Sequence, residues 1–172
     1  MSEPPPLPPV EPTEPPPPLP PPIDMATRRA LAVGLYNHCW ELLEIPDRTL
    51  EQDAELIHAA HASRYHWGEI ADTSARLWRG EWMCARVYAV LGRGEPALWH
   101  ARRAVTLVEA GGAATAEWDR PAVYEAMARA SFVAGDAAEG TAWKARAGEL
   151  AAALTDADDR EVIERDLATL PG

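Results

Sequence analysis

The chain has 172 residues, of which 27 are acidic and 16 basic, so its formal net charge is −11 at pH 7. This balance argues against binding of nucleic acid or of anionic membrane surfaces, because both need a basic stripe or patch. No apolar run approaches the ~20 residues of a membrane-spanning helix, and the two cysteines form no CxxC pair. With no secretory signal pattern at the N-terminus, we expect a cytoplasmic protein.

The first 24 residues form a separate, proline-rich segment. They hold 13 of the 17 prolines, in runs such as EPPPLPPV and EPPPPLPPP. Because proline fixes φ and lacks an N–H, such runs favour extended polyproline II without internal hydrogen bonds. We expect a disordered tail over 1–24, followed by one domain over 25–172. A ligand for an aromatic-lined proline-binding groove is the alternative role of the tail.

From Met25 onward the sequence predicts helices alone. No stretch alternates in the manner of a strand, and Pro46, Pro96, Pro121 and Pro171 fall between helical patterns or in their first turns. The expected helices run over 25–44, 50–67, 74–92, 95–110, 119–134, 137–154 and 157–168. The fold class is therefore all-α.

Several of these helices carry their own end signals. Thr49, Asp136 and Asp156 stand where an N-cap side chain accepts a hydrogen bond from a first-turn N–H. Gly92 and Gly135 stand at the ends of the third and fifth helices, where a left-handed residue closes a helix.

An internal repeat links the middle of the chain to its second half. The stretch ARVYAVLGRGEPALWHARRA at 85–104 lines up without gaps with ARASFVAGDAAEGTAWKARA at 128–147, at an offset of 43 residues. Ala85 matches Ala128, and Gly92 matches Gly135. Small residues at matching positions let the two helices of a hairpin approach closely. The repeat therefore predicts two similar helical hairpins.

This pattern resembles the tetratricopeptide repeat, whose antiparallel helix pairs stack into a curved solenoid. The resemblance covers about residues 78–154 and rests on Ala85, Tyr88, Gly92, Ala97 and Ala104 in the first unit and on Ala128, Gly135 and Ala147 in the second. The usual period is ~34 residues, and the extra length lies in EAGGAATAEW. The resemblance implies a short solenoid of antiparallel helical hairpins. The stretches HAAHASRYHW and RGEW also resemble a group of uncharacterised bacterial helical proteins, which implies no activity.

The tetratricopeptide resemblance also implies a binding groove, because the first helix of each pair lines the concave surface in that family. By position, this groove would carry Arg79, Trp82, Arg86, Glu125, Arg129 and Phe132. Arginine binds carboxylates through a planar fork, and the aromatic side chains would add apolar anchoring area. We therefore expect a protein- or peptide-binding module for an acidic partner. In the alternative interpretation, the arginines pair with acidic neighbours such as Glu81 and Glu125 in an internal network.

Three of the five histidines lie in the stretch ELIHAAHASRYHW. On a helix, Glu55, His58 and His61 share one face at i, i+3 spacing, which lets side chains bind a common divalent metal. A closed site needs a ligand from another helix, and His38 and Glu81 are the candidates. The second hypothesis is therefore a small metalloprotein or metalloenzyme, with His58 at the centre of its site. His38 also lies on an apolar stripe, so we expect it to point into the core.

The histidine face has two further interpretations. It is either a solvated polar surface with incidental histidines, or a surface that packs on a partner or on a second copy of the chain in a homodimer. We interpret His100 as structural, and neither Cys39 nor Cys84 stands in a recognisable Cys/His signature. The sequence leaves open whether this protein is an enzyme.

Overall fold

The computed structural model describes residues 22–70, 74–111 and 115–171. Within these ranges the chain forms seven α-helices and no strand, which confirms the all-α prediction. The helices are α1 (Met25–Leu43), α2 (Leu50–Glu69), α3 (Ser74–Val90), α4 (Gly94–Ala110), α5 (Asp119–Val133), α6 (Ala137–Ala152) and α7 (Ala157–Ala168). Each end lies within two residues of its expected position. The tail expected over 1–24 lies outside the described residues, apart from 22–24.

Local side chains begin the helices as expected. The hydroxyl of Thr49 accepts a hydrogen bond from the backbone N–H of Gln52 at 3.2 Å. In return, the backbone N–H of Thr49 donates to the side-chain oxygen of Gln52 at 2.9 Å. This reciprocal pair is a capping box at the start of α2. Asp136 and Asp156 accept hydrogen bonds from first-turn amides of α6 and α7. The helix starts therefore follow from the sequence itself.

The two units of the internal repeat close their first helices in the same way. Gly92 and Gly135 have φ angles of 70° and 88°, in the left-handed region that glycine adopts at low cost. After Gly92, the backbone N–H of Arg93 donates to the carbonyl of Tyr88 at 2.8 Å. After Gly135, that of Asp136 donates to the carbonyl of Ser131 at 2.9 Å. These are the bonds of a Schellman motif, and they turn the chain back into α4 and α6.

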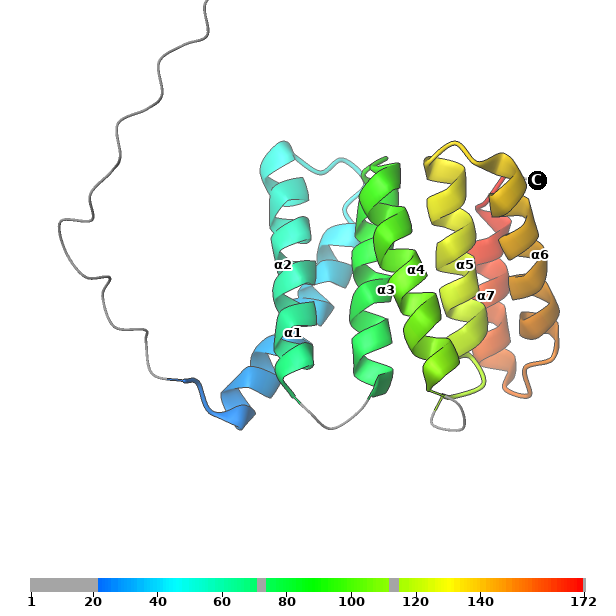
Figure 1. The fold of residues 1–172 in the computed structure, drawn as a ribbon. Coiled ribbons are helices and arrows are strands. Elements are labelled where there is room, and N and C mark those ends of the chain that lie inside the picture. Colours follow the sequence, from blue (N-terminus) through cyan, green and yellow to red (C-terminus); the bar gives the residue numbers. More distant parts are fainter. Residues whose placement is uncertain (1–21, 71–73, 112–114, 172) are drawn as a thin grey trace, which may run out of the picture.

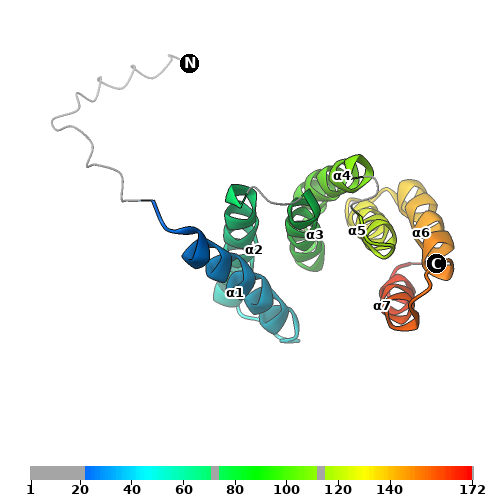
Figure 2. The ribbon, with the colours of Figure 1, turned by 90° about the horizontal axis from the view of Figure 1, so that it is seen from below.

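The helices pack as successive pairs along an arc. In Figure 1 the neighbours α1–α2, α3–α4 and α5–α6 lie side by side and run in opposite directions, and α7 packs against α5 and α6. Figure 2 shows α2, α4 and α6 on the outer side of the arc and α1, α3, α5 and α7 on the inner side. The helical hairpins match the expectation, and a solenoid of the tetratricopeptide type stays a prediction.

The core combines large side chains with close helix contacts. Trp78, Leu56 and Met83 are almost completely buried. At the contact between α4 and α5 the backbones approach closely, because a Cβ added to Gly94 would lie 2.5 Å from the Cα of Ala134. This position therefore tolerates only glycine, and the approach fixes how α4 and α5 lie beside each other.

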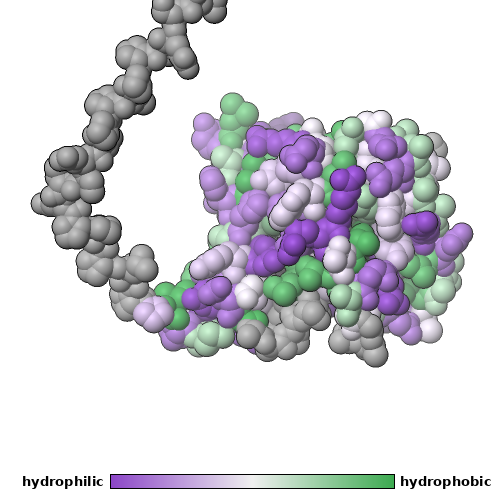
Figure 3. Space-filling model, viewed as in Figure 1, coloured by the Kyte–Doolittle hydropathy of each residue, from purple (hydrophilic) through white to green (hydrophobic). Residues whose placement is uncertain are grey.

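The outer side of the arc has a mixed surface. Figure 3 shows hydrophilic side chains predominating there, with hydrophobic ones in small groups. Across the described ranges, no helix combines the length and the apolar character needed to cross a membrane.

Candidate functional site

An aromatic pocket lies on the inner side of the arc, between α1, α3, α5 and α7. Its volume is about 240 Å³. The aromatic residues that line it are Tyr36, Trp40, Trp78, Trp82 and Trp118. Val162 and Ile163 of α7 and Ala122 of α5 complete its apolar wall. We refer to this cavity as the aromatic pocket.

Helical spacing brings the rings of the aromatic pocket together. Tyr36 and Trp40 are four residues apart on α1, and Trp78 and Trp82 are four apart on α3, so each pair shares one helix face. The ring centroids of Trp40 and Trp82 lie 5.7 Å apart, as do those of Trp78 and Trp118. These separations are typical of favourable aromatic pairs. The rings thus form a wall of the pocket from two groups in contact, Tyr36–Trp40–Trp82 and Trp78–Trp118.

Two arginines lie against this wall. The guanidinium carbon of Arg79 is 5.2 Å from the ring centroid of Trp78 and 4.8 Å from that of Trp118. The guanidinium carbon of Arg86 is 5.8 Å from the ring centroids of both Trp40 and Trp82. Both arginines are within cation–π distance. Arg79 also donates to Asp119 at 3.2 Å and keeps 40% of its side chain exposed.

Arg86 and Arg129, expected to bind a partner's carboxylates, are engaged within the protein. Arg86 donates two hydrogen bonds to Asp166, at 2.8 and 2.9 Å. Arg129 donates to Glu125 at 2.8 Å and to the hydroxyl of Thr169 at 2.7 Å. Because α7 packs across the inner side, Asp166 and Thr169 accept hydrogen bonds from these two guanidiniums. This placement corrects the groove interpretation for these two arginines and matches the internal network.

The other expected groove residues divide between two locations. Arg79, Trp82 and Glu125 line the aromatic pocket. Burial raises the pKa of Glu125, although the neighbouring guanidiniums act in the opposite direction. Phe132 packs instead over α6, where its ring lies 2.9 Å from the position of a Cβ on Gly140. The glycine in α6 makes room for this ring, so Phe132 is not an anchor in the aromatic pocket.

A wider and more open depression of about 570 Å³ lies over α4 and the end of α5. Leu98, Trp99 and Arg102 contribute to it, and Trp99 is 53% exposed. Its walls come mainly from one helix, whereas four helices converge on the aromatic pocket. The aromatic pocket is therefore the better candidate for selective binding.

The four expected metal ligands do not come together. His38 lies between two carboxylates, with Nε2 2.8 Å from Glu55 and Nδ1 3.0 Å from Glu41. Hydrogen bonds to Glu41 and Glu55 raise the pKa of His38. His58 is exposed on α2, whereas His61 turns toward α3 and α4. These positions correct two predictions, since His58 is not the centre of a site and His38 is not in the core.

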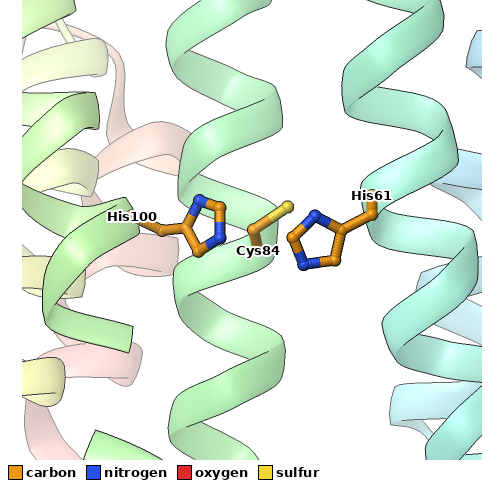
Figure 4. Close-up of side chains that lie close together, drawn as sticks. All are labelled: His61, Cys84 and His100. Carbon is orange, nitrogen blue, oxygen red and sulfur yellow. The ribbon is translucent and has the colours of Figure 1, made fainter. Parts of the chain in front are cut away.

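His61 belongs to a different group of potential ligands. His61 of α2, Cys84 of α3 and His100 of α4 each offer one ligand atom, and the three atoms lie within 4.8 Å of one another. Figure 4 shows the side chains converging from three neighbouring helices. Cys84 is fully buried and His100 is 7% exposed, while His61 is half-buried. We call these three residues the His–Cys cluster.

Each histidine of the His–Cys cluster already has one hydrogen-bond partner. The Nε2 atom of His61 lies 2.9 Å from the hydroxyl of Tyr88, and the Nδ1 atom of His100 lies 2.7 Å from a carboxylate oxygen of Glu81. Such partners set the tautomer and the orientation of an imidazole. The Nδ1 atom of His61 and the Nε2 atom of His100 have no hydrogen bond to another described residue.

Glu81 is a buried carboxylate that connects three helices. Besides His100 of α4, its partners are the Nε atoms of Arg64 of α2 at 2.9 Å and Arg103 of α4 at 3.2 Å. Burial acts to raise the pKa of Glu81, but the bonds to His100, Arg64 and Arg103 outweigh it and lower the pKa to about 2. Glu81 therefore remains ionised at neutral pH.

Burial also sets the protonation of the His–Cys cluster in the absence of a metal. It raises the pKa of the Cys84 thiol, and the nearby charge of Glu81 adds to this effect. Burial lowers the pKa of His61, with a further contribution from His100. At neutral pH the Cys84 thiol is therefore protonated and the His61 imidazole is neutral. A neutral imidazole has a nitrogen lone pair that can bind a Lewis acid.

The sequence interpretation missed Cys84 and His100 as members of a site. One signal was present, because Glu81, Cys84 and Tyr88 stand at i, i+3 and i+7 and so share a helix face. The sequence does not show that His61 and His100 lie opposite that face of α3. That depends on how α2 and α4 pack on α3.

Comparisons with known proteins do not assign a family. No protein-family model matches the chain, and neither a curated protein nor a solved structure matches it. The interpretation of both sites therefore rests on their geometry and chemistry.

Proposed function

We propose that this protein is a binding module whose aromatic pocket receives one large apolar side chain of a peptide or protein segment, beside an acidic residue that pairs with Arg79. The observation that carries this proposal is the convergence of aromatic rings from α1, α3 and the start of α5 on one cavity. Aromatic walls offer a large apolar contact area, and pockets that bury an anchor side chain dominate the energy of many interfaces.

The size of the aromatic pocket favours a side chain over a whole small molecule. Pockets for drug-sized ligands and cofactors have volumes of roughly 300–1,000 Å³. The aromatic pocket holds about 240 Å³, below that range. A Leu, Phe or Trp side chain from a bound segment suits this volume.

Acidic side chains line the pocket at Glu125, Asp159 and Asp166, but the two guanidiniums over the tryptophan rings favour an anionic neighbour at that wall. Aromatic cages often bind cations, but Arg79 and Arg86 already lie over the tryptophan rings. A further cation would be repelled by two guanidiniums. Arg86 is paired with Asp166 and Arg79 with the buried Asp119, but the Arg79 side chain keeps 40% of its surface exposed. Arg79 is therefore the group that we expect to pair with a partner's carboxylate.

Two buried donors next to the aromatic pocket also support a ligand. The Nε1 atom of Trp78 and the Nε atom of Arg79 are buried and have no acceptor among the described residues. Buried donors are nearly always paired in native proteins. Both atoms belong to residues that line the pocket. A carbonyl or carboxylate oxygen of a bound segment would satisfy them.

A peptide array tests the proposal directly. Short peptides would carry Trp, Phe, Leu or Ala at a central position, flanked either by Asp or by Lys, and would be probed with the purified full-length protein. Fluorescence anisotropy would then give Kd for the peptides that bind. We expect binding of peptides with a large apolar centre and Asp flanks, and none of those with an Ala centre. A preference for Lys flanks would contradict the assignment of Arg79.

Two matched pairs of variants locate the binding site. Val162→Trp fills the pocket from α7, and Val162 is 46% exposed, so the fold should tolerate it. Val90→Trp is its control, because Val90 is 45% exposed and lies outside the pocket. We expect Val162→Trp to weaken binding by about tenfold or more, and Val90→Trp to leave it unchanged. Equal affinities of the two variants would rule out the aromatic pocket.

The second pair tests the carboxylate. Arg79→Gln should raise Kd for Asp-flanked peptides more than for peptides with neutral flanks. Arg120→Gln is the control, because the side chains of Arg79 and Arg120 are 40% and 41% exposed. An equal change in both variants would point to a general effect of net charge.

A further inference from the structure

The His–Cys cluster has the donor set of a transition-metal site. Two imidazoles and one thiol converge from α2, α3 and α4, with their ligand atoms within 4.8 Å of one another. Imidazole and thiolate are ligands that zinc prefers, whereas magnesium and calcium prefer oxygen. No carboxylate stands among the three ligand atoms, since Glu81 bonds to the outer side of His100.

We propose that the His–Cys cluster binds one Zn²⁺ ion through Nδ1 of His61, Sγ of Cys84 and Nε2 of His100. The other nitrogen of each imidazole is held by a neighbour, at 2.9 Å by Tyr88 and at 2.7 Å by Glu81. Metal-binding histidines characteristically donate their second N–H to a carboxylate or another oxygen, which orients the ring. The two nitrogens assigned to the metal are thus those that their neighbours leave available.

The distances need only a small adjustment. Zinc lies ~2.0–2.1 Å from imidazole nitrogen and ~2.3 Å from thiolate sulfur, so tetrahedral ligand atoms are about 3.3–3.7 Å apart. Since the ligand atoms lie within 4.8 Å of one another, their separations need to shorten by at most about 1.1–1.5 Å. His61 is half-buried, so its ring is the least enclosed of the three ligands. Three protein ligands leave a fourth position for water or another ligand, as in catalytic zinc sites.

The same residues also make sense as a packed cluster without a metal. The rings of His61 and His100 have centroids 5.1 Å apart, and those of Tyr88 and His100 stack at 5.7 Å. In that case the three side chains would only hold the helices together. An experiment can distinguish the metal site from the packed cluster, because only the metal site requires the sulfur of Cys84 as a ligand.

The experiment uses the full-length chain without a histidine tag, stripped of metal by a chelator. Zn²⁺ would be titrated in competition with a chromophoric chelator, and Co²⁺ would replace it for absorption spectroscopy. We expect one Zn²⁺ per chain. With Co²⁺ we expect a thiolate-to-cobalt charge-transfer band in the near ultraviolet and strong visible bands of a four-coordinate ion. Absence of saturable binding, or a cobalt spectrum without the thiolate band, would overturn the proposal.

Matched variants identify the ligands. Cys84→Ser should abolish the thiolate band, whereas Cys39→Ser should retain it, and both cysteines are buried. His61→Gln should weaken Zn²⁺ binding by at least tenfold, whereas His58→Gln, on the exposed part of the same helix, should leave it unchanged. Far-ultraviolet circular dichroism would show that each variant keeps its helices. Loss of binding in His58→Gln would instead assign the ion to the outer surface of α2 and refute this site.

Tyr88→Phe tests the positioning role of the hydroxyl beside His61. Loss of such a partner typically costs ~10–100-fold in metal affinity. Tyr88→Phe loaded with Co²⁺ should keep the thiolate charge-transfer band, because all three ligands remain. An unchanged Zn²⁺ affinity would show that the Tyr88 hydroxyl does not position His61 for the metal.

Discussion

The carboxylate of Asp166 in α7 accepts two hydrogen bonds from the guanidinium of Arg86 in α3, at 2.8 and 2.9 Å. The two residues are 80 positions apart in the chain. Their side chains are only 17% and 21% exposed, and a bidentate pair of this kind is among the stronger polar contacts in proteins. The pair holds α7 across the inner side of the arc, where Val162 and Ile163 of the same helix close the aromatic pocket.

We expect Arg86→Ala and Asp166→Ala each to lower the free energy of unfolding by about 1–3 kcal/mol, because each removes both hydrogen bonds of a partly buried ion pair. A double-mutant cycle from urea denaturation would measure the coupling. Arg102 and Glu139 are the control pair, since they are 3.8 Å apart and Arg102 is 62% exposed. Their coupling should be below about 0.5 kcal/mol. A coupling between Arg86 and Asp166 as small as that of the control would contradict this role.

Glu81 should make the metal-free protein sensitive to acid. Its pKa is about 2 in the folded state, below the ordinary value of 4.5. The unfolded chain therefore takes up this proton first, so the stabilisation is complete above about pH 4.5 and is lost as the pH falls toward 2. Glu81→Gln should reduce stability at pH 6 by a few kcal/mol and flatten the loss below pH 4.5.

Urea denaturation at pH 6, 4 and 3 checks the Glu81 prediction. Glu164→Gln serves as the control, because Glu164 is exposed on α7. It should follow the wild-type curve at every pH. If Glu81→Gln and the wild type lose stability in parallel, Glu81 does not supply the acid sensitivity.

Both thiols should react slowly in the folded, metal-free protein. Burial raises the pKa of Cys39 to about 12, and it also raises the pKa of Cys84. The thiolate is the reactive species, so little of it exists at pH 8. An aromatic disulfide reagent should therefore modify the cysteines at a rate limited by opening of the structure, and should modify both at once in concentrated urea. Rapid reaction of one thiol in the folded state would contradict the burial of that side chain.

Two glycines should respond to alanine in opposite directions. Gly135 has a φ angle of 88°, so Gly135→Ala should destabilise the protein by about 1 kcal/mol. Gly148 lies within α6, and a Cβ added there would meet no atom within 4 Å. Gly148→Ala should stabilise by about 0.5–1 kcal/mol, because alanine favours the helix. Thermal unfolding of both variants checks the prediction, which fails if their Tm values shift in the same direction.

The positions of the helices were predictable because the signals that set them are local. The cap at Thr49 is completed by Gln52, three residues later, and the reversal at Gly135 needs only the bonds of its own turn. The alternation of helices and turns is therefore contained in short stretches of sequence. For the same reason each helix end lay within two residues of its expected position.

The partners of the charged side chains were not predictable in this way. Arg86 and Arg129 occupy matching places in the repeat, which favoured a groove that would leave both guanidiniums to a ligand. The packing of α7 decided otherwise, because it brings Asp166 and Thr169 against them. Residues so far apart in the chain meet only through the packing of whole helices.

The histidine stretch shows the same division. By itself, the sequence determined that α2 is a helix and that His58 and His61 fall on neighbouring parts of its surface, since helical periodicity requires it. Tertiary structure decided that His61 faces Cys84 and His100 while His58 stays in solvent. The physical reason is that a helix sets the angles between its own side chains, whereas the packing of its neighbours determines which of them are buried and what they meet.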